Sequence, residues 1–172
     1  MKVLIVNGSS HVNGTTMQAI QAVSYTHRAR LCAANHMTLH LIKPLGFSID
    51  DKHVKRAGLD YWHLVDVQVH ENIEELYAKY PDRRYFYATT KAKHVHSDVK
   101  FEIGDMLVFG PETRGLPESL LEGNEETCIR IPMVEEARSL NLSNSVAIIA
   151  YEAMRQLDYP DLKEVGNWIS HK

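Results

Sequence analysis

The feature that most constrains this chain is the alternation of short apolar, β-rich runs with stretches of helical spacing. The runs that predict strands are 2–6, 38–43, 65–70, 84–90, 105–110 and 127–132. The stretches that predict helices are 16–34, 71–80, 143–157 and a short one after Pro117. Alternation on this scale favours one α/β domain over residues 1–172, with a mostly parallel sheet and flanking helices.

A parallel sheet places its ligand beyond the carboxyl ends of its strands, which directs attention to the loops that follow the later strands. In the loop FGPETRGLP (109–117), Gly110 would let a ligand approach the backbone, although glycine and proline are equally typical of a structural turn. The segment 129–144 leads into the last predicted helix. There, Asn141 or Ser143 is expected to cap the helix, or else the helix amides face a ligand.

The net charge of −3 is distributed unevenly along the chain. Residues 1–100 hold 13 basic and 9 acidic side chains, whereas residues 101–172 hold 6 basic and 13 acidic ones. A surface that binds phosphates therefore belongs to the first part. The basic clusters within 52–56 and 83–93 are its candidates, with a solvated charged face as the alternative.

Neither cysteine, Cys32 nor Cys128, belongs to a CxxC pair, so the sequence indicates neither a zinc site nor a disulfide framework. Both are expected to be buried free thiols. Histidines stand close together within 36–40 and within 94–96, but no cysteine or carboxylate completes a ligand set. We therefore expect no metal.

The sequence also predicts a cytoplasmic protein without a membrane span. No apolar run approaches the roughly 20 residues that a membrane helix needs. The opening run MKVLIV stops at Asn7 and Gly8, which is too short for a signal peptide, and no small-residue cleavage site follows it.

Three segments near the C-terminus, FGPETRGLP (109–117), IRIPM (129–133) and SLNLSN (139–144), occur in the order found in the SPOUT methyltransferases. They most resemble the family of tRNA (cytidine(34)-2′-O)-methyltransferases, also known as TrmL or YibK. The resemblance includes the stretch 39–62 and covers about residues 28–160. It implies an α/β domain whose C-terminal segment threads a deep trefoil knot, which holds S-adenosylmethionine in a bent conformation. It also implies a homodimer.

The resemblance further implies a reaction, the transfer of a methyl group to the ribose 2′-oxygen of the wobble nucleotide of tRNA. This nucleotide is cytidine 34 or a modified uridine 34, and the direct displacement needs no metal. Positions that match the family's cofactor site are Ala88, Gly110, Ile131, Ser139 and Leu142. Arg30 matches the family's catalytic arginine. Because a guanidinium stays protonated, we expect it to orient the hydroxyl or phosphate and to stabilise developing negative charge. Candidates for phosphate contacts, from charge and position, are Lys52, Lys55, Arg56, Lys91 and Arg114.

Residues 1–27 depart from the family pattern. Where relatives have a loop of the form PxIPxNTGNI, this chain has AIQAVSYTHRA (19–29), without the Asn-Thr-Gly-Asn element. The segment MKVLIVNGSSHVNGTT (1–16) is instead similar to the start of flavodoxin-like, NADPH-dependent FMN reductases, although it also suits an ordinary β–α turn. Three hypotheses follow: an active tRNA methyltransferase, a catalytically impaired protein that binds S-adenosylmethionine or RNA, and a flavin-dependent oxidoreductase.

Overall fold

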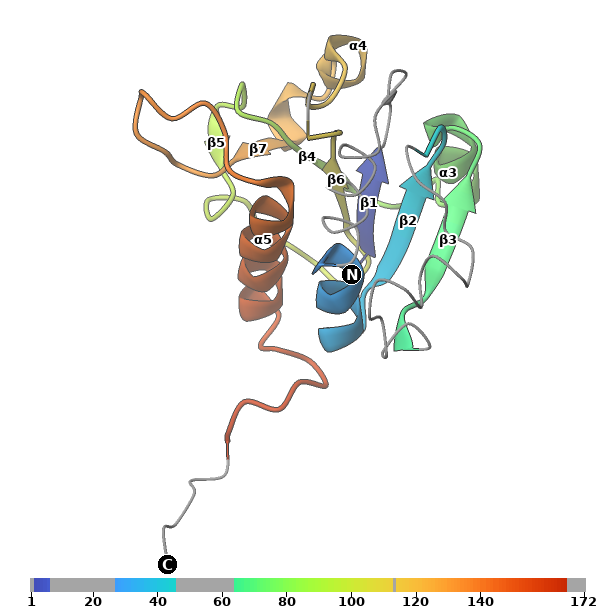
Figure 1. Cartoon of the computed structure of the whole chain (residues 1–172), viewed down its shortest axis with the longest axis vertical. Coiled ribbons are helices and arrows are strands. Elements are labelled where there is room, and N and C mark those ends of the chain that lie inside the picture. Colours follow the sequence, from blue (N-terminus) through green and yellow to red (C-terminus); the bar gives the residue numbers. More distant parts are fainter. Residues whose placement is uncertain (1, 7–26, 46–63, 113, 167–172) are drawn as a thin grey trace, which may run out of the picture.

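The computed structural model describes residues 2–6, 27–45, 64–112 and 114–166. Within these ranges, strands and helices alternate along the chain and build a sheet with helices on both sides (Figure 1). The first predicted helix, 16–34, is seen as helical residues 27–34, and its earlier part lies outside the described residues.

The described strands form one sheet of seven in the order β3-β2-β1-β6-β4-β7-β5. Their bounds are β1 Lys2–Val6, β2 Thr38–Ile42, β3 Val67–His70, β4 Tyr85–Ala88, β5 His94–Val95, β6 Met106–Phe109 and β7 Cys128–Arg130. Every neighbouring pair runs parallel. The prediction of a parallel α/β sheet is therefore confirmed, and β1 lies inside the sheet, between β2 and β6.

Besides residues 27–34, the described helices are α3 Ile73–Lys79, α4 Glu118–Leu121, the 3₁₀ helix η2 Glu125–Thr127 and α5 Leu142–Gln156. Two of them, α3 and α5, begin at an asparagine whose side chain caps them. The Asn72 side chain accepts a hydrogen bond from the Glu75 amide, 2.9 Å away. Asn141 does the same for the Ser143 amide at 2.9 Å, so Asn141 is the cap of α5 and Ser143 is not. Within the described part of the chain, every helix is too short or too polar to span a bilayer.

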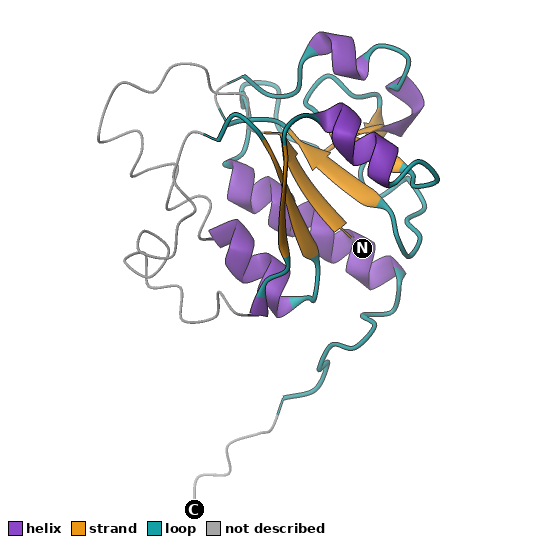
Figure 2. Cartoon of the chain, turned by 90° about the vertical axis from the view of Figure 1, so that its right-hand side faces the viewer, coloured by secondary structure: helices purple, strands orange, loops and turns teal. Residues whose placement is uncertain are grey.

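Two separate cores lie on the two faces of the sheet, because successive residues of a strand point to opposite faces. In β6, Leu107 and Phe109 join the core formed with α5 and residues 27–34. Met106 and Val108 join the other core, which Leu76 of α3 and side chains of α4 complete. Figure 2 shows the resulting layers, with the strands between the two groups of helices.

The structure differs from the sequence prediction mainly at strand ends. The strand predicted over 84–90 ends at Ala88, and the one predicted over 65–70 begins at Val67. β5 was not predicted, because two residues at the edge of a sheet leave no periodic signal.

Candidate functional site

A cavity of about 500 Å³ lies at the carboxyl ends of three adjacent strands, β6, β4 and β7. Its lining includes all five positions that the sequence matched to a cofactor site: Ala88, Gly110, Ile131, Ser139 and Leu142. The N-terminal parts of α4 and α5 complete its wall. This is where an open parallel sheet is expected to bind a ligand.

Strand register brings these positions together. Ala88 is the last residue of β4, and it pairs with Phe109 of β6 on one side and with Ile129 of β7 on the other. Gly110 and Ile131 directly follow β6 and β7, so neighbouring strands deliver them to the same edge. The Thr89 amide donates a hydrogen bond to the Ile129 carbonyl at 3.0 Å, which fixes the exit of β4.

Gly110 is required by the chain itself, in line with the alternative of a structural turn. A Cβ atom at this position would lie 2.2 Å from the carbonyl carbon of Gly115 and 2.3 Å from the amide nitrogen of Leu116. The glycine therefore lets the 110–116 loop pack against its own backbone, and it also lines the cavity. The Gly115 amide donates to the Pro111 carbonyl at 2.9 Å, and Gly115 has a φ of +69°, which favours glycine.

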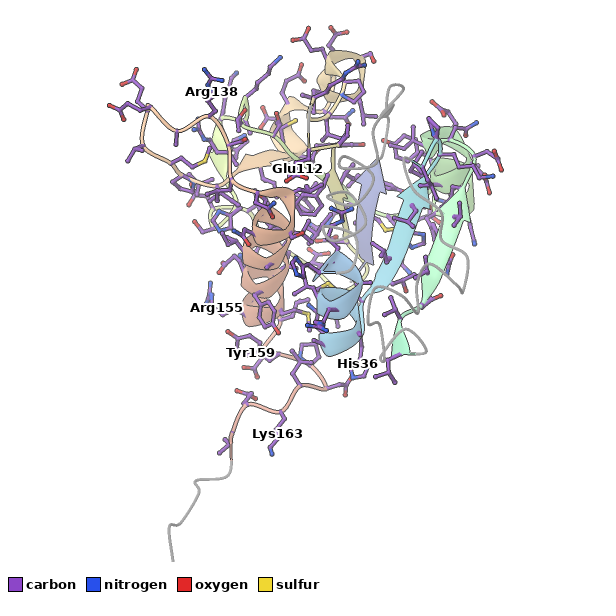
Figure 3. All side chains as sticks on the ribbon, in the orientation of Figure 1. His36, Glu112, Arg138, Arg155, Tyr159 and Lys163 are labelled. Atoms are coloured by element: carbon purple, nitrogen blue, oxygen red, sulfur yellow. The ribbon has the colours of Figure 1, made fainter. Side chains whose placement is uncertain are left out.

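Asn141 links this loop to α5. Its Nδ2 donates to Oε1 of Glu112 at 2.8 Å, while its Oδ1 caps the helix. Figure 3 shows Glu112 beside the N-terminal end of α5. The sequence indicated Asn141 as a cap but not this contact, because Glu112 and Asn141 lie far apart in the sequence. The contact sets the position of the 110–116 loop relative to α5. The loop and the helix both border the cavity.

Two of the predicted phosphate contacts line the same cavity. Lys91 and Arg114 are both exposed at its wall. Lys91 forms an ion pair with Glu118, and this hydrogen bond lowers the pKa of the Glu118 carboxyl. A phosphate would therefore compete with Glu118 for Lys91. The other three, Lys52, Lys55 and Arg56, lie outside the described residues, as does the Ser/Asn/Gly/Thr loop within 7–16.

Arg30 is not among the described residues that line the cavity. It lies exposed on the helix 27–34, whereas its neighbour Arg28 is buried. The structure of one chain thus gathers the predicted cofactor positions but does not bring the predicted catalytic arginine to them.

The two cysteines and several histidines lie within the described residues. Cys32 and Cys128 are both free and buried, which confirms the prediction. Burial raises the pKa of the Cys32 thiol to about 12. Within the described ranges, no three His, Cys, Asp or Glu side chains gather as metal ligands. His40 pairs with His70 across β2 and β3, with 3.0 Å between Nδ1 and Nε2, an arrangement that the sequence did not predict.

Comparison with known proteins identifies the family. The model of the SpoU rRNA methylase family matches residues 26–151 of this chain. The chain belongs to this family. A relative from Methylovorus glucosotrophus, named tRNA (cytidine(34)-2′-O)-methyltransferase, is 53% identical over 131 residues, which cover 76% of this chain and 85% of the relative. A relative of the same name from Escherichia coli K12 is 49% identical over 132 residues, covering 76% and 84%.

Solved structures agree with this assignment. A structure described as giving insights into the 2-OH methylation of C/U34 on tRNA superimposes with a TM-score of 0.76 at 37% identity, covering 91% of this chain and 95% of the other. The SpoU methyltransferase AviRb from Streptomyces viridochromogenes, solved with the cofactor AdoMet, has a TM-score of 0.70 and covers 92% and 60%. Its identity of 20% supports the fold alone.

Proposed function

We propose that this protein transfers the methyl group of S-adenosylmethionine to the ribose 2′-oxygen of the wobble nucleotide of tRNA, cytidine 34 or a modified uridine 34. The observation that carries the proposal is the cavity at the strand ends, which gathers all five positions matched to the cofactor site. The relatives described above are named for this reaction.

The cavity suits S-adenosylmethionine in size and in chemistry. Its volume of about 500 Å³ lies within the range of small-molecule sites. Apolar side chains of Leu116, Leu142 and Ile149 provide surface for the adenine, and Ser139 and Thr89 offer polar groups for the ribose or the amino-acid part. When bound, the cofactor supplies a methyl group activated by a positively charged sulfur. The protein's part is to hold that methyl group in line with the ribose oxygen.

Arg30 acts in this proposal on the ribose hydroxyl or the adjoining phosphate, as a cation that stabilises developing negative charge. Arg30 does not line the cavity of its own chain, although the proposed reaction needs it there. A homodimer in which the partner subunit supplies this arginine accounts for the difference. The outer surface of α5 supports a homodimer. Ile148 and Tyr151 lie there one turn apart with exposed fractions of 39% and 42%, and exposed apolar side chains grouped in this way typify interfaces.

We also infer that the chain forms one SPOUT domain whose C-terminal segment threads a trefoil knot. The close packing of Gly110 against residues 115–116 and the hydrogen bond between Glu112 and Asn141 support this inference, because they hold the two loops of the proposed knot together.

A tRNA substrate further favours the cytoplasm as the place of action. Phosphate contacts are assigned to Lys52, Lys55, Arg56, Lys91 and Arg114.

The alternative of a catalytically impaired protein rests on the altered segment 19–29. An assay of methyl transfer distinguishes this alternative from an active methyltransferase. Purified protein is incubated with total tRNA and S-adenosylmethionine that carries a tritiated methyl group. We expect label on the 2′-oxygen of nucleotide 34, and a loss of roughly 100-fold in Arg30→Ala with unchanged cofactor affinity. Lys163→Ala, which removes an exposed cation from the C-terminal segment, is the matched control. Binding of cofactor and tRNA without transfer would support the impaired protein instead.

A further inference from the structure

A second concave surface lies on the opposite face of the sheet from α5. It is a groove of about 580 Å³ between α3, β4 and α4. Its lining includes Tyr77, Tyr85, Tyr87, Arg83, Ser119 and Leu120. Among the described residues, none of the side chains assigned above to the cofactor or to phosphate lines it.

The three tyrosines form a fixed aromatic wall. The rings of Tyr77 and Tyr85 meet edge to face, with 4.8 Å between their centroids. The hydroxyls of Tyr77 and Tyr87 are hydrogen-bonded at 2.8 Å, and the Tyr85 hydroxyl donates to the Tyr80 carbonyl at 2.9 Å. Tyr87 is buried, whereas Tyr77 and Tyr85 remain partly exposed to the groove. These contacts order the rings before any ligand arrives.

The hydroxyl pair can also recognise the polar edge of a ligand. Each phenol has one proton to donate, and the bond between Tyr77 and Tyr87 uses only one of the two. The other O–H and the oxygen lone pairs can pair with an acceptor and a donor on a planar ring. Burial raises the pKa of both phenols, so both protons are present at neutral pH.

Arg83 gives the groove a positive charge. It is the one charged side chain among the described residues of the lining, and none of them is acidic. Its guanidinium lies over Gly104, where an added Cβ atom would be 1.9 Å from Nη1. Arg83 forms no ion pair within the described residues, whereas its neighbour Arg84 pairs with Asp105 at 2.7 Å. A groove with aromatic walls and one available guanidinium is complementary to a base that carries a phosphate.

The groove and the cofactor cavity adjoin the same two elements. In α4, Glu118 lines the cavity, and the next residue, Ser119, lines the groove. In β4, Ala88 lines the cavity and Tyr87 lines the groove. A single RNA strand passing over α4 could therefore contact both sites.

We propose that this groove binds an unpaired nucleobase of the tRNA substrate, with Arg83 at the adjoining phosphate. The proposal rests on the proposed function, since it assigns a second contact to the same substrate. It predicts that changes in the groove weaken tRNA binding and leave cofactor binding intact.

The test measures the dissociation constant for tRNA by fluorescence anisotropy and that for S-adenosylmethionine by calorimetry, at one fixed salt concentration. Tyr77→Leu removes the ring, Tyr77→Phe keeps the ring but removes the O–H, and Arg83→Ala removes the charge. We expect the affinity for tRNA to fall roughly fivefold or more in Tyr77→Leu and in Arg83→Ala. The loss of affinity in Tyr77→Phe should be smaller, because the ring remains. Lys163→Ala, which also removes one exposed cation, is expected to stay within twofold of the wild type.

Several results would overturn the proposal. Unchanged tRNA affinity in Arg83→Ala and Tyr77→Leu would do so. A shift in oligomeric state with unchanged tRNA affinity would point to a protein partner instead. Because Tyr77→Leu could disturb folding, a tRNA containing 4-thiouridine is also photocrosslinked to the wild type. Crosslinks at residues 77–87 are expected, and crosslinks confined to other elements would contradict the proposal. Failure of the proposed function looks different, since the wild type would then bind tRNA without methylating it.

Discussion

At Gly110 the chain passes so close to itself that only a hydrogen atom fits in place of a side chain. The obstruction is backbone, the carbonyl carbon of Gly115 and the amide of Leu116, and backbone cannot rotate away as a side chain can. The shape of the cavity proposed for the cofactor therefore depends on a residue without a side chain.

Gly110→Ala is expected to force the 110–116 loop outward and to weaken S-adenosylmethionine binding at least tenfold. Overpacking of this kind also lowers the free energy of unfolding by about 1–3 kcal/mol. Calorimetry with the cofactor and urea unfolding measure the two effects. Gly123→Ala is the control, because a Cβ atom at Gly123 would meet nothing within 4 Å, and its φ of +79° makes alanine there costly to stability alone. It should lose some stability and keep its cofactor affinity; equal losses of affinity in both variants would contradict the explanation.

Ala88, Gly110 and Ile131 were proposed because they match the family's cofactor positions, not from the apolar pattern of the strands. The structure brings them to one edge of the sheet, since each ends or directly follows a strand. The close approach of Gly110 to residues 115–116 could not be predicted, since a contact between two parts of a loop has no counterpart in the sequence. The partner of Asn141 was missed for the same reason.

Among the elements, α5 is tied to the preceding part of the chain by side chains near its C-terminal end. Gln156 accepts a hydrogen bond from the Phe101 amide at 3.0 Å and donates one to the Val99 carbonyl at 3.1 Å. Glu152 accepts from Gln156 at 2.9 Å and from Arg155 at 2.8 Å. The Arg155 guanidinium, first among several causes, lowers the pKa of the Glu152 carboxyl from its ordinary 4.5 to about 2.

Glu152→Gln is therefore expected to destabilise the protein by about 0.5–1 kcal/mol at pH 7, the size of a partly exposed ion pair. A carboxyl with a lowered pKa stabilises the fold above its ordinary pKa and loses that effect as the pH falls through its folded value. The difference between wild type and variant should thus shrink below pH 4.5 and vanish near pH 2. Urea unfolding at several pH values measures it. Glu164→Gln, an exposed carboxylate in the C-terminal segment, serves as the control, and a difference independent of pH would contradict this account.

Helices and strands could be predicted where the apolar pattern that indicates them lies within one short stretch of sequence. The apolar spacing of Val146, Ile149 and Ala153 predicted α5, and all three are buried. The two-residue β5 was missed because it owes its existence to pairing with β7. The groove of tyrosines was missed because α3, β4 and α4 each contribute only part of it.

The whole molecule combines a basic first part with an acidic second part. The five residues assigned to phosphate lie mostly in the first part, with Arg114 as the exception. A tRNA bound through several such contacts releases counterions, which makes its affinity sensitive to salt.

Raising the salt concentration from about 50 to 150 mM is expected to weaken tRNA binding on the order of tenfold or more. Fluorescence anisotropy over a series of salt concentrations gives the slope of log K against log salt. Lys55→Ala should make this slope shallower, whereas Lys163→Ala should leave it unchanged. An affinity that does not respond to salt would exclude binding through phosphates.

The central position of β1 bears on how this chain can carry an unusual N-terminal segment. β1 is held on both sides by parallel main-chain pairing, Lys2–Val6 with β2 and Lys2–Ile5 with β6. A strand inside such a sheet must be β-forming and apolar, as VLIV (3–6) is, but the main-chain pairing itself does not depend on which apolar residues it holds. One β-forming, apolar N-terminus can thus stand in for another while the sheet keeps its order, and the departure of residues 1–27 from the family pattern is compatible with this architecture.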